Sequence, residues 1–115
     1  MKPGDYCPSA GDLIWIDLNP TSGHEQRGRR PALVLSPRSY NERTELCVAC
    51  AITNQTKGFC FEVALPPGGV VTGVVLADQI RCLSWQARRA EFIQEASPEI
   101  LEETREKVAA LIGIE

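Results

Sequence analysis

The stretch LCVACAIT, residues 46–53, decides the fold class of this chain. Its side chains sort into two sets, because successive residues of an extended strand face opposite sides. One face carries the larger apolar side chains: Leu46, Val48, Cys50 and Ile52. The other face carries small side chains and ends in a hydroxyl: Cys47, Ala49, Ala51 and Thr53. We therefore predict a β-strand with open room beside the Thr53 hydroxyl.

Further strands are predicted on both sides of this one. DLIWIDL (12–18) is rich in branched and aromatic residues and precedes a turn-forming Asn-Pro pair. A polar loop is expected over 20–30, and PALVLS (31–36) is predicted to be a strand that tolerates proline at its first position. Residues 37–45 are polar, and we expect an irregular segment with room for one helical turn. Later strands are predicted over 59–65, 73–82 and 88–94, the first with four inward side chains: Phe59, Phe61, Val63 and Leu65.

The last segment changes from a strand period to a helical one. Ser97 can cap a helix, Pro98 suits its first position, and Gly113 fits its end. One stripe recurs at helical spacing: Leu101, Thr104, Val108, Leu111 and Ile112. Many short strands followed by one terminal helix predict a single domain, 1–115, that is mainly β. We expect a small curled antiparallel barrel with a C-terminal helix.

The composition supports one folded domain. The chain has 115 residues, of which 43% are hydrophobic, and this is typical of a single core and not of a disordered chain. No stretch approaches the roughly 20 apolar residues of a membrane helix. The opening MKPGDYCPSAGD lacks the apolar region of a secretory signal. We therefore expect a compact cytoplasmic protein with no membrane contact.

The five cysteines allow two interpretations. Cys47 and Cys50 form a CxxC pair, which zinc and redox sites also use. However, residues i and i+3 of a strand face opposite sides, and no second Cys or His pair completes a tetrahedral set. We expect reduced, buried thiols that pack as small apolar residues, and no metal or cofactor.

Charge is distributed unevenly along the chain. The formal net charge is −3, but residues 91–115 carry seven Glu against Arg105 and Lys107, which leaves residues 1–90 with an excess of two positive charges. The segment 24–43 holds five arginines and two glutamates. Binding to a polyanion depends on the local field and not on the total charge. This segment is therefore either a nucleic-acid-binding surface or a solvated basic loop.

Four stretches cover nearly the whole chain in the order of one known family: GDLIWIDLNPTSGHEQRGRRPALVLSP (11–37), YNERT (40–44), AITNQTKGFCFEV (51–63) and GVVLADQIRCLSWQAR (73–88). Together they resemble the MazF/PemK/Kid family of toxin endoribonucleases. The resemblance implies an SH3-like barrel of the PemK/CcdB toxin fold, a homodimer, and metal-independent cleavage of single-stranded RNA. It also implies a cognate antitoxin, arrest of translation, and products with a 2′,3′-cyclic phosphate and a 5′-hydroxyl.

That reaction defines what the residues must supply. A ribose 2′-hydroxyl attacks the neighbouring phosphate, so a base takes the 2′ proton and an acid protonates the leaving 5′ oxygen. Hydrogen-bond donors stabilise the charge of the phosphorane. The RNA provides the nucleophile, so the protein needs no catalytic Ser or Cys. The sequence has no cluster of carboxylates at ligand spacing that would indicate a metal.

The resemblance places the catalytic arginine at Arg30 and the catalytic hydroxyl at Thr53. A guanidinium is planar, always charged and matched to two phosphate oxygens, so Arg30 suits stabilisation of the phosphorane. The alternative is a loop arginine paired with Glu25 or Asp17. Thr53 suits a hydrogen bond to a phosphoryl oxygen, and the alternative is β-propensity at a strand end.

The family match also points to residues around this pair. His24 and Glu25 are the candidates for proton transfer, since histidine titrates near neutrality and a glutamate can accept the 2′ proton or orient the arginine. The alternatives are a surface histidine without a role and a structural salt bridge. The predicted RNA contacts are Gln26, Arg27, Arg29, Asp78 and Gln79.

One position limits the assignment of Asp78 and Gln79, and two tryptophans allow two interpretations. Leu76 stands where Kid-like members carry a basic residue, so Asp78 and Gln79 are assigned to RNA contact or site architecture and not to catalysis. Trp15 and Trp85 either stack on bases or pack in the core.

Two rival functions are a CcdB-like topoisomerase poison and an inactive RNA-binding barrel. The first is associated with a tryptophan near the C-terminus, whereas this chain ends in LIGIE with no tryptophan after Trp85. The presence of Arg30 and Thr53 weighs against the second.

Overall fold

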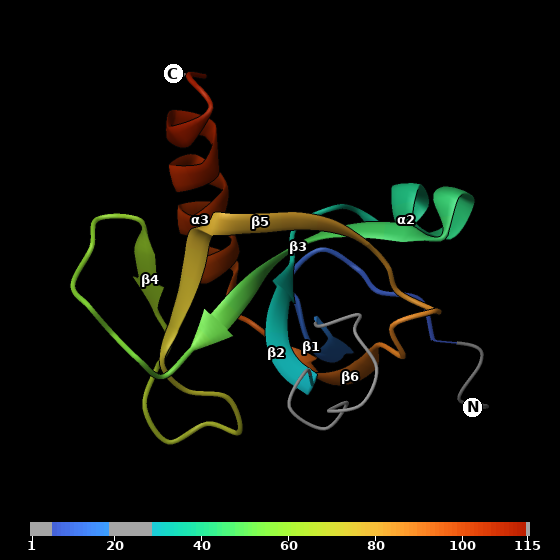
Figure 1. The fold of residues 1–115 in the computed structure, drawn as a ribbon, viewed down its shortest axis with the longest axis horizontal. Helices are drawn as coiled ribbons and strands as arrows, with labels where there is room; N and C mark the ends of the chain where they lie inside the picture. The colour runs from blue at the N-terminus through green and yellow to red at the C-terminus, as the bar shows by residue number, and fades with distance from the viewer. Residues whose placement is uncertain (1–5, 19–28, 115) are drawn as a thin grey trace.

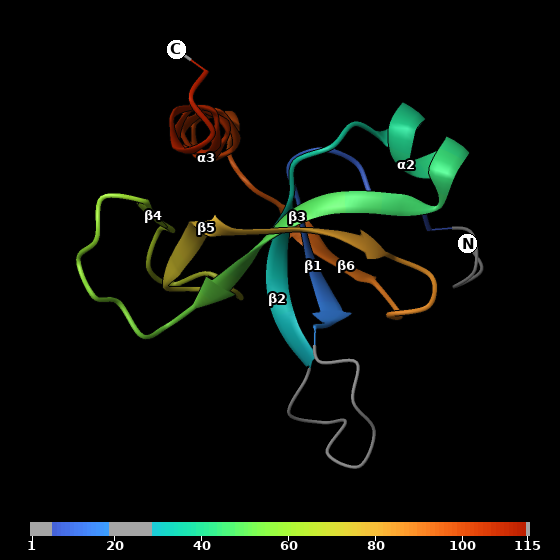
Figure 2. The ribbon, with the colours of Figure 1, turned by 45° about the horizontal axis from the view of Figure 1, so that its top comes forward.

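A computed structural model describes residues 6–18 and 29–114 (Figure 1). Its core is one six-stranded sheet with the strand order β4-β5-β3-β2-β1-β6, and every neighbouring pair is antiparallel. The elements are β1 (Asp12–Asp17), β2 (Arg29–Val34), α2 (Arg38–Thr44), β3 (Leu46–Thr53), β4 (Glu62–Ala64), β5 (Val74–Ser84), β6 (Glu91–Glu95) and α3 (Pro98–Leu111). The sheet is curled, with α3 beside β5 and β4 and with α2 at the opposite end of β3 (Figure 2). The predicted class, mainly β with a C-terminal helix, is confirmed.

Both faces of β3 are buried, because the curled sheet has an apolar cluster on each side. The α3-side cluster comprises Leu13, Leu33, Leu35, Cys50, Ile52, Val63, Leu65, Val71, Val75 and Ile100. The Trp85 cluster comprises Cys7, Ile14, Ile16, Ala32, Val34, Cys47, Ala49, Leu83 and Trp85. Alternate residues of β3 enter different clusters, as the alternation in residues 46–53 predicts. The small residues on the second face serve close packing, which Trp85 completes from the end of β5.

The helix α3 forms where the sequence predicts it. The Ser97 hydroxyl accepts a hydrogen bond from the backbone N–H of Ile100 (3.3 Å), and Pro98 is the first helical residue. Leu101 and Val108 pack against the α3-side cluster. The predicted stripe is wrong at its end: Leu111 is 53% exposed, because the helix projects beyond the edge of the sheet (Figure 1).

Residues 38–44 form a helix of seven residues, longer than the single helical turn expected within an irregular segment. Its anchor is the fully buried Asn41. The Asn41 amide donates to the carbonyls of Pro8 (2.8 Å) and Ser36 (3.0 Å), and its backbone carbonyl accepts from the Trp85 indole N–H (3.0 Å). Trp85 therefore packs in the core, which decides between its two interpretations.

Several strand boundaries differ from the prediction. β2 begins at Arg29 and not at Pro31, because Ile16 pairs with Arg30 and Asp17 with Arg29 across the two strands. The strand predicted over 59–65 shortens to Glu62–Ala64, since the Glu62 carboxylate accepts the backbone N–H groups of residues 57 and 58 and folds the preceding chain into a turn. The last strand begins at Glu91, after a turn over residues 85–89.

The cysteines are free thiols, and Cys7, Cys47 and Cys50 are buried. Cys47 and Cys50 lie in different apolar clusters on opposite faces of the sheet. Burial raises the pKa of each of these two thiols to about 12, so both remain protonated near neutral pH. The CxxC pair is therefore a packing feature.

Within the described ranges, neither helix has the length or the apolar surface needed to cross a bilayer.

Candidate active site

Arg30 and Thr53 lie at the same level of adjacent antiparallel strands. Ala32 pairs with Ala51 across β2 and β3, and each candidate residue lies two positions further along its strand, toward the same end of the sheet. Both residues line one groove of about 560 Å³, together with Leu18, Pro31, Asn54 and Thr72 among others. We call this the Arg30–Thr53 groove. Two residues from separate segments thus share one surface hollow.

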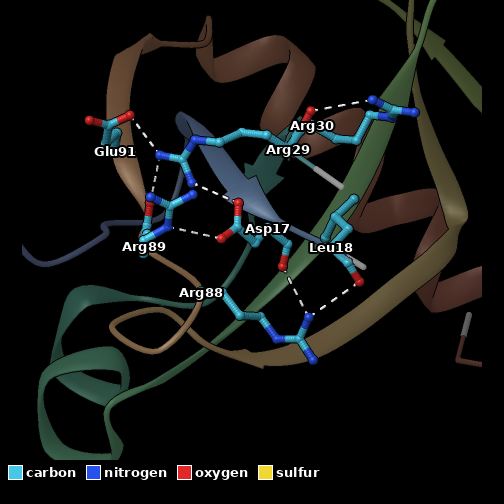
Figure 3. Close-up of polar contacts among 7 residues, drawn as sticks. All are labelled: Asp17, Leu18, Arg29, Arg30, Arg88, Arg89 and Glu91. Carbon is cyan, nitrogen blue, oxygen red and sulfur yellow. Dashed lines mark hydrogen bonds and ion pairs between the residues drawn. The ribbon is translucent and has the colours of Figure 1, made fainter. Parts of the chain in front are cut away.

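The Arg30 side chain is exposed and directed to the side opposite Arg29 (Figure 3). Its guanidinium donates a hydrogen bond to the Arg29 carbonyl (3.3 Å). The alternative that Arg30 pairs with Asp17 is wrong, because the Asp17 carboxylate binds Arg29 and Arg89. No carboxylate among the described residues pairs with Arg30. Glu25, the other partner considered for it, lies outside those residues.

Thr53 ends β3, and its hydroxyl oxygen accepts a hydrogen bond from the backbone N–H of Gln55 (3.1 Å). Because the oxygen acts as acceptor there, the hydroxyl proton can be donated to a second partner. Gly73 fixes the backbone at this point. It has a φ of +102°, and a Cβ at that position would overlap the Thr53 carbonyl oxygen and the Asn54 side chain.

A second hollow of about 300 Å³ adjoins the first, and both are lined by Thr53, Gln55 and Leu76. We call it the Asp78 pocket, and its remaining lining is Lys57, Phe59, Phe61, Glu62, Asp78 and Gln79. The structure therefore brings the predicted RNA contacts Asp78 and Gln79 next to Thr53.

A bend in β5 places Asp78 and Gln79 at this position. Two steps along β3, from Cys50 to Ile52, correspond to five along β5, from Ile80 to Val75. The extra residues interrupt the regular ladder between β3 and β5, and β5 turns sharply along its length (Figure 1). One carboxylate oxygen of Asp78, Oδ1, is buried without a hydrogen-bond partner among the described residues. A buried acceptor of this kind is costly unless a ligand supplies a donor.

The pocket has an aromatic wall that the sequence pattern does not predict. Phe59 and Phe61 stack with ring centroids 5.3 Å apart, and Phe59 is 52% exposed. The sequence predicts both rings on the inward side of a strand, but the turn before β4 directs them to the pocket. The sequence feature that indicates this wall is the pair Phe59 and Phe61, separated by one residue and preceded by Lys57 and Gly58.

Arg29, a predicted RNA contact, is bound within the protein. Its guanidinium donates to Asp17 (3.0 Å) and Glu91 (2.6 Å). Partial burial alone would lower the pKa of Arg29, but the bonds to Glu91 and Asp17 outweigh this and raise it. Its charge is thus largely compensated by carboxylates, and direct RNA contact by Arg29 stays a prediction.

His24, Glu25, Gln26 and Arg27 lie outside the described residues, so their roles stay predictions. Among residues 6–18 and 29–114, no three His, Cys, Asp or Glu side chains come close enough to hold a metal ion.

An exposed guanidinium and an alcohol on one groove, beside an aromatic-walled pocket, are groups suited to holding a phosphodiester and a nucleobase. The fold and the site thus define a small curled β protein with an exposed guanidinium, an alcohol and an aromatic wall gathered on one surface.

A family model described as PemK-like, MazF-like toxin of type II toxin-antitoxin system matches residues 9–112, and the chain belongs to this family. It is 47% identical over 108 residues to the endoribonuclease toxin MazF of Escherichia coli K12, covering 94% of this chain and 96% of the relative. It is 39% identical to the endoribonuclease toxin ChpB of the same organism, covering 89% of this chain and 91% of the relative.

Solved structures agree with this membership. MazF from Deinococcus radiodurans in crystal form I has a TM-score of 0.87 and 53% identity, covering 96% of this chain and 100% of that chain. A MazE–MazF complex from the same organism, form II, has a TM-score of 0.86 and 48% identity, with the same coverage. The family resemblance and the toxin fold read from the sequence are therefore confirmed.

Proposed function

We propose that this chain is the endoribonuclease toxin of a toxin–antitoxin system, and that it cleaves single-stranded RNA in the Arg30–Thr53 groove. The observation that carries the proposal is the placement of an exposed arginine and a threonine hydroxyl in one hollow of adjacent strands. Family membership and the close relatives named as endoribonucleases support the same activity.

The groove suits a reaction in which RNA supplies its own nucleophile. The ribose 2′ oxygen forms a bond to the adjacent phosphorus while the bond from phosphorus to the 5′ oxygen breaks. This leaves a 2′,3′-cyclic phosphate and a 5′-hydroxyl. The Arg30 guanidinium stabilises two phosphorane oxygens through paired N–H donors. The Thr53 hydroxyl donates a hydrogen bond to a phosphoryl oxygen.

Two proton transfers complete the balance. The 2′ proton leaves to a base as the 2′ oxygen attacks, and the 5′ oxygen gains a proton from an acid as it departs. Glu25 and His24 are our candidates for these steps. The RNA and the side chains thus suffice, and we propose that cleavage needs no metal.

The Asp78 pocket suits a nucleotide next to the cleaved bond. Phe59 is exposed and stacked on Phe61, so it offers a ring face to a base. Asp78 and Gln79 offer polar groups to the edge of that base. A protein that reads single-stranded RNA through such pockets cleaves at selected sequences.

We also propose that a cognate antitoxin protein binds this chain, because MazE–MazF complexes are among its structural neighbours. An extended acidic segment would fit the arginine side of the groove and block RNA. We further propose a homodimer, and we place the reaction in the cytoplasm, where messenger RNA is translated and its cleavage would arrest synthesis.

The test is incubation of the purified protein with a long RNA in EDTA, followed by mapping of the cleaved ends. We expect cuts at discrete positions with a cyclic phosphate on one product. Replacing the 2′-hydroxyl at the scissile nucleotide with hydrogen should abolish that cut. Continued cleavage of the deoxy substrate would exclude this mechanism, and binding without scission would favour an inactive RNA-binding barrel.

A further inference from the structure

Asp17, at the end of β1, joins two arginines with its two carboxylate oxygens (Figure 3). Oδ1 accepts from Arg29 (3.0 Å), its cross-strand neighbour on β2. Oδ2 accepts from Arg89 (3.0 Å), in the turn before β6. The Asp17 side chain is only 23% exposed. One carboxylate therefore connects three segments of chain.

Arg29 extends this connection to a second carboxylate. Its guanidinium also donates to Glu91 on β6 (2.6 Å) and to the Arg89 carbonyl (2.8 Å). We call Asp17, Arg29, Arg89 and Glu91 the arginine clamp.

Hydrogen bonds to the backbone of residues 17 and 18 hold the end of β1 next to the clamp. The Asp17 N–H donates to the Arg88 carbonyl (3.0 Å), and the Arg88 guanidinium donates to the carbonyls of Asp17 (3.0 Å) and Leu18 (3.2 Å). Arg81 also donates to the Leu18 carbonyl (3.0 Å). The end of β1 is thus held on several sides.

The clamp lies directly beside Arg30 and on the opposite side of β2 from its guanidinium (Figure 3). Consecutive strand residues face opposite sides, and Figure 3 shows the two guanidinium groups pointing away from each other. The pairing between β2 and β3 ends at Ala32 and Ala51, so Arg30 is paired only with β1. Among the described residues, the Arg30 side chain makes one hydrogen bond, of 3.3 Å, to the Arg29 carbonyl. The bonds that hold Arg29 therefore also hold the adjacent strand backbone from which the Arg30 side chain projects.

We propose that Asp17 is a positioning residue for Arg30: by binding Arg29 and Arg89 together, it directs the Arg30 guanidinium into the groove. This inference rests on the proposed function, and it requires no contact between Asp17 and RNA. Partly exposed ion pairs contribute little to stability, whereas a displacement of about 1 Å at a reacting centre can cost about 10²-fold in rate. The clamp should therefore affect catalysis more than folding.

A double-mutant cycle tests the proposal on a short RNA substrate with one cleavage site. The variants are Asp17→Asn, Arg30→Ala and the two together, with kcat and KM measured for each. Asp17→Asn should lower kcat by about 10- to 100-fold and change KM by less than about threefold. In the Arg30→Ala background, Asp17→Asn should have no further effect, because the group it positions is gone.

A matched control separates the clamp from ion pairs in general. Arg38 and Glu42 form an exposed pair on α2, away from the groove, and Glu42→Gln should leave kcat unchanged. If Asp17→Asn does not fold, Glu91→Gln loosens the same clamp from its exposed end, and the same cycle with Arg30→Ala applies.

The outcomes distinguish the two proposals. Unchanged kcat in the clamp variants, or losses that multiply independently with that of Arg30→Ala, would overturn the positioning role. Wild-type cleavage by Arg30→Ala alone would instead overturn the proposed function.

Discussion

Arg30 and Thr53 face one groove from adjacent strands, each two residues beyond the paired alanines Ala32 and Ala51. Both side chains line the same hollow, although the regular pairing of the two strands ends at these alanines. The chemistry that we propose depends on this shared position. The first two predictions test its two members separately.

Replacing Arg30 with alanine should reduce RNA cleavage by about 10²- to 10⁴-fold, because it removes a charged donor from the phosphorane. The side chain is exposed, so the free energy of unfolding should change by less than about 0.5 kcal/mol. Cleavage rates and urea unfolding measure the two effects. Arg38→Ala is the control, since Arg38 is an exposed arginine on α2, and it should retain full activity.

Thr53 should act through its hydroxyl and not through its β-branched shape. Thr53→Ala should lower kcat by about 10²-fold, the loss typical of one transition-state donor, whereas Thr53→Ser should stay within a few fold of the wild type. Single-turnover cleavage at saturating enzyme measures both. Equal losses in the two variants would contradict the role of the hydroxyl as donor.

Gly73 should be needed for the position of Thr53. Gly73→Ala would place a methyl group against the Thr53 carbonyl at a φ of +102°, so we expect a loss of stability of about 1–3 kcal/mol and a marked loss of cleavage. Gly68→Ala is the control, because Gly68 has a φ of +87° with open space around an added Cβ. Gly68→Ala should lose stability through backbone strain alone and should keep its cleavage activity.

The clamp should make stability depend on pH in the acidic range. Partial burial alone would raise the pKa of Asp17, but hydrogen bonds from Arg89 and Arg29 outweigh it and lower that pKa. The stabilisation is therefore complete above the unfolded value of about 3.9 and is lost as the pH falls through the lower folded value. Asp17→Asn should be less stable than the wild type by about 1 kcal/mol at neutral pH. Urea unfolding should show this difference shrinking as the pH falls below the unfolded value of about 3.9. A difference that stays constant as the pH falls through the acidic range would contradict the assignment.

The exposed thiols should react with alkylating reagents and the buried thiols should not. Cys60 and Cys82 are exposed, while Cys7, Cys47 and Cys50 are buried, and burial raises the pKa of all three. Because the thiolate is the reactive form, N-ethylmaleimide should modify two cysteines in the native protein and all five in denaturant. Mass spectrometry of digests reads the sites. Rapid native labelling of Cys47 would show that the Trp85 cluster is open.

Local patterns account for the elements that the sequence predicts correctly. The alternation in residues 46–53 and the helical period after Ser97 are imposed by backbone geometry, so they are visible without knowledge of the partners. The helix over 38–44 escapes the same analysis, because its anchor is the buried Asn41 bonded to Pro8 and Trp85. Those partners are remote in the sequence, and no local period records them.

The sequence by itself determined the class of fold, the family and the residue types that RNA cleavage requires. Only the tertiary structure decided which of them meet: the shared groove of Arg30 and Thr53, the arrival of Asp78 and Phe59 in the adjoining pocket, and the withdrawal of Arg29 into ion pairs. The physical reason is that strand register, the bend in β5 and ion pairs between distant segments depend on long-range contacts. Residue type sets what a side chain can do, and these contacts set where it acts.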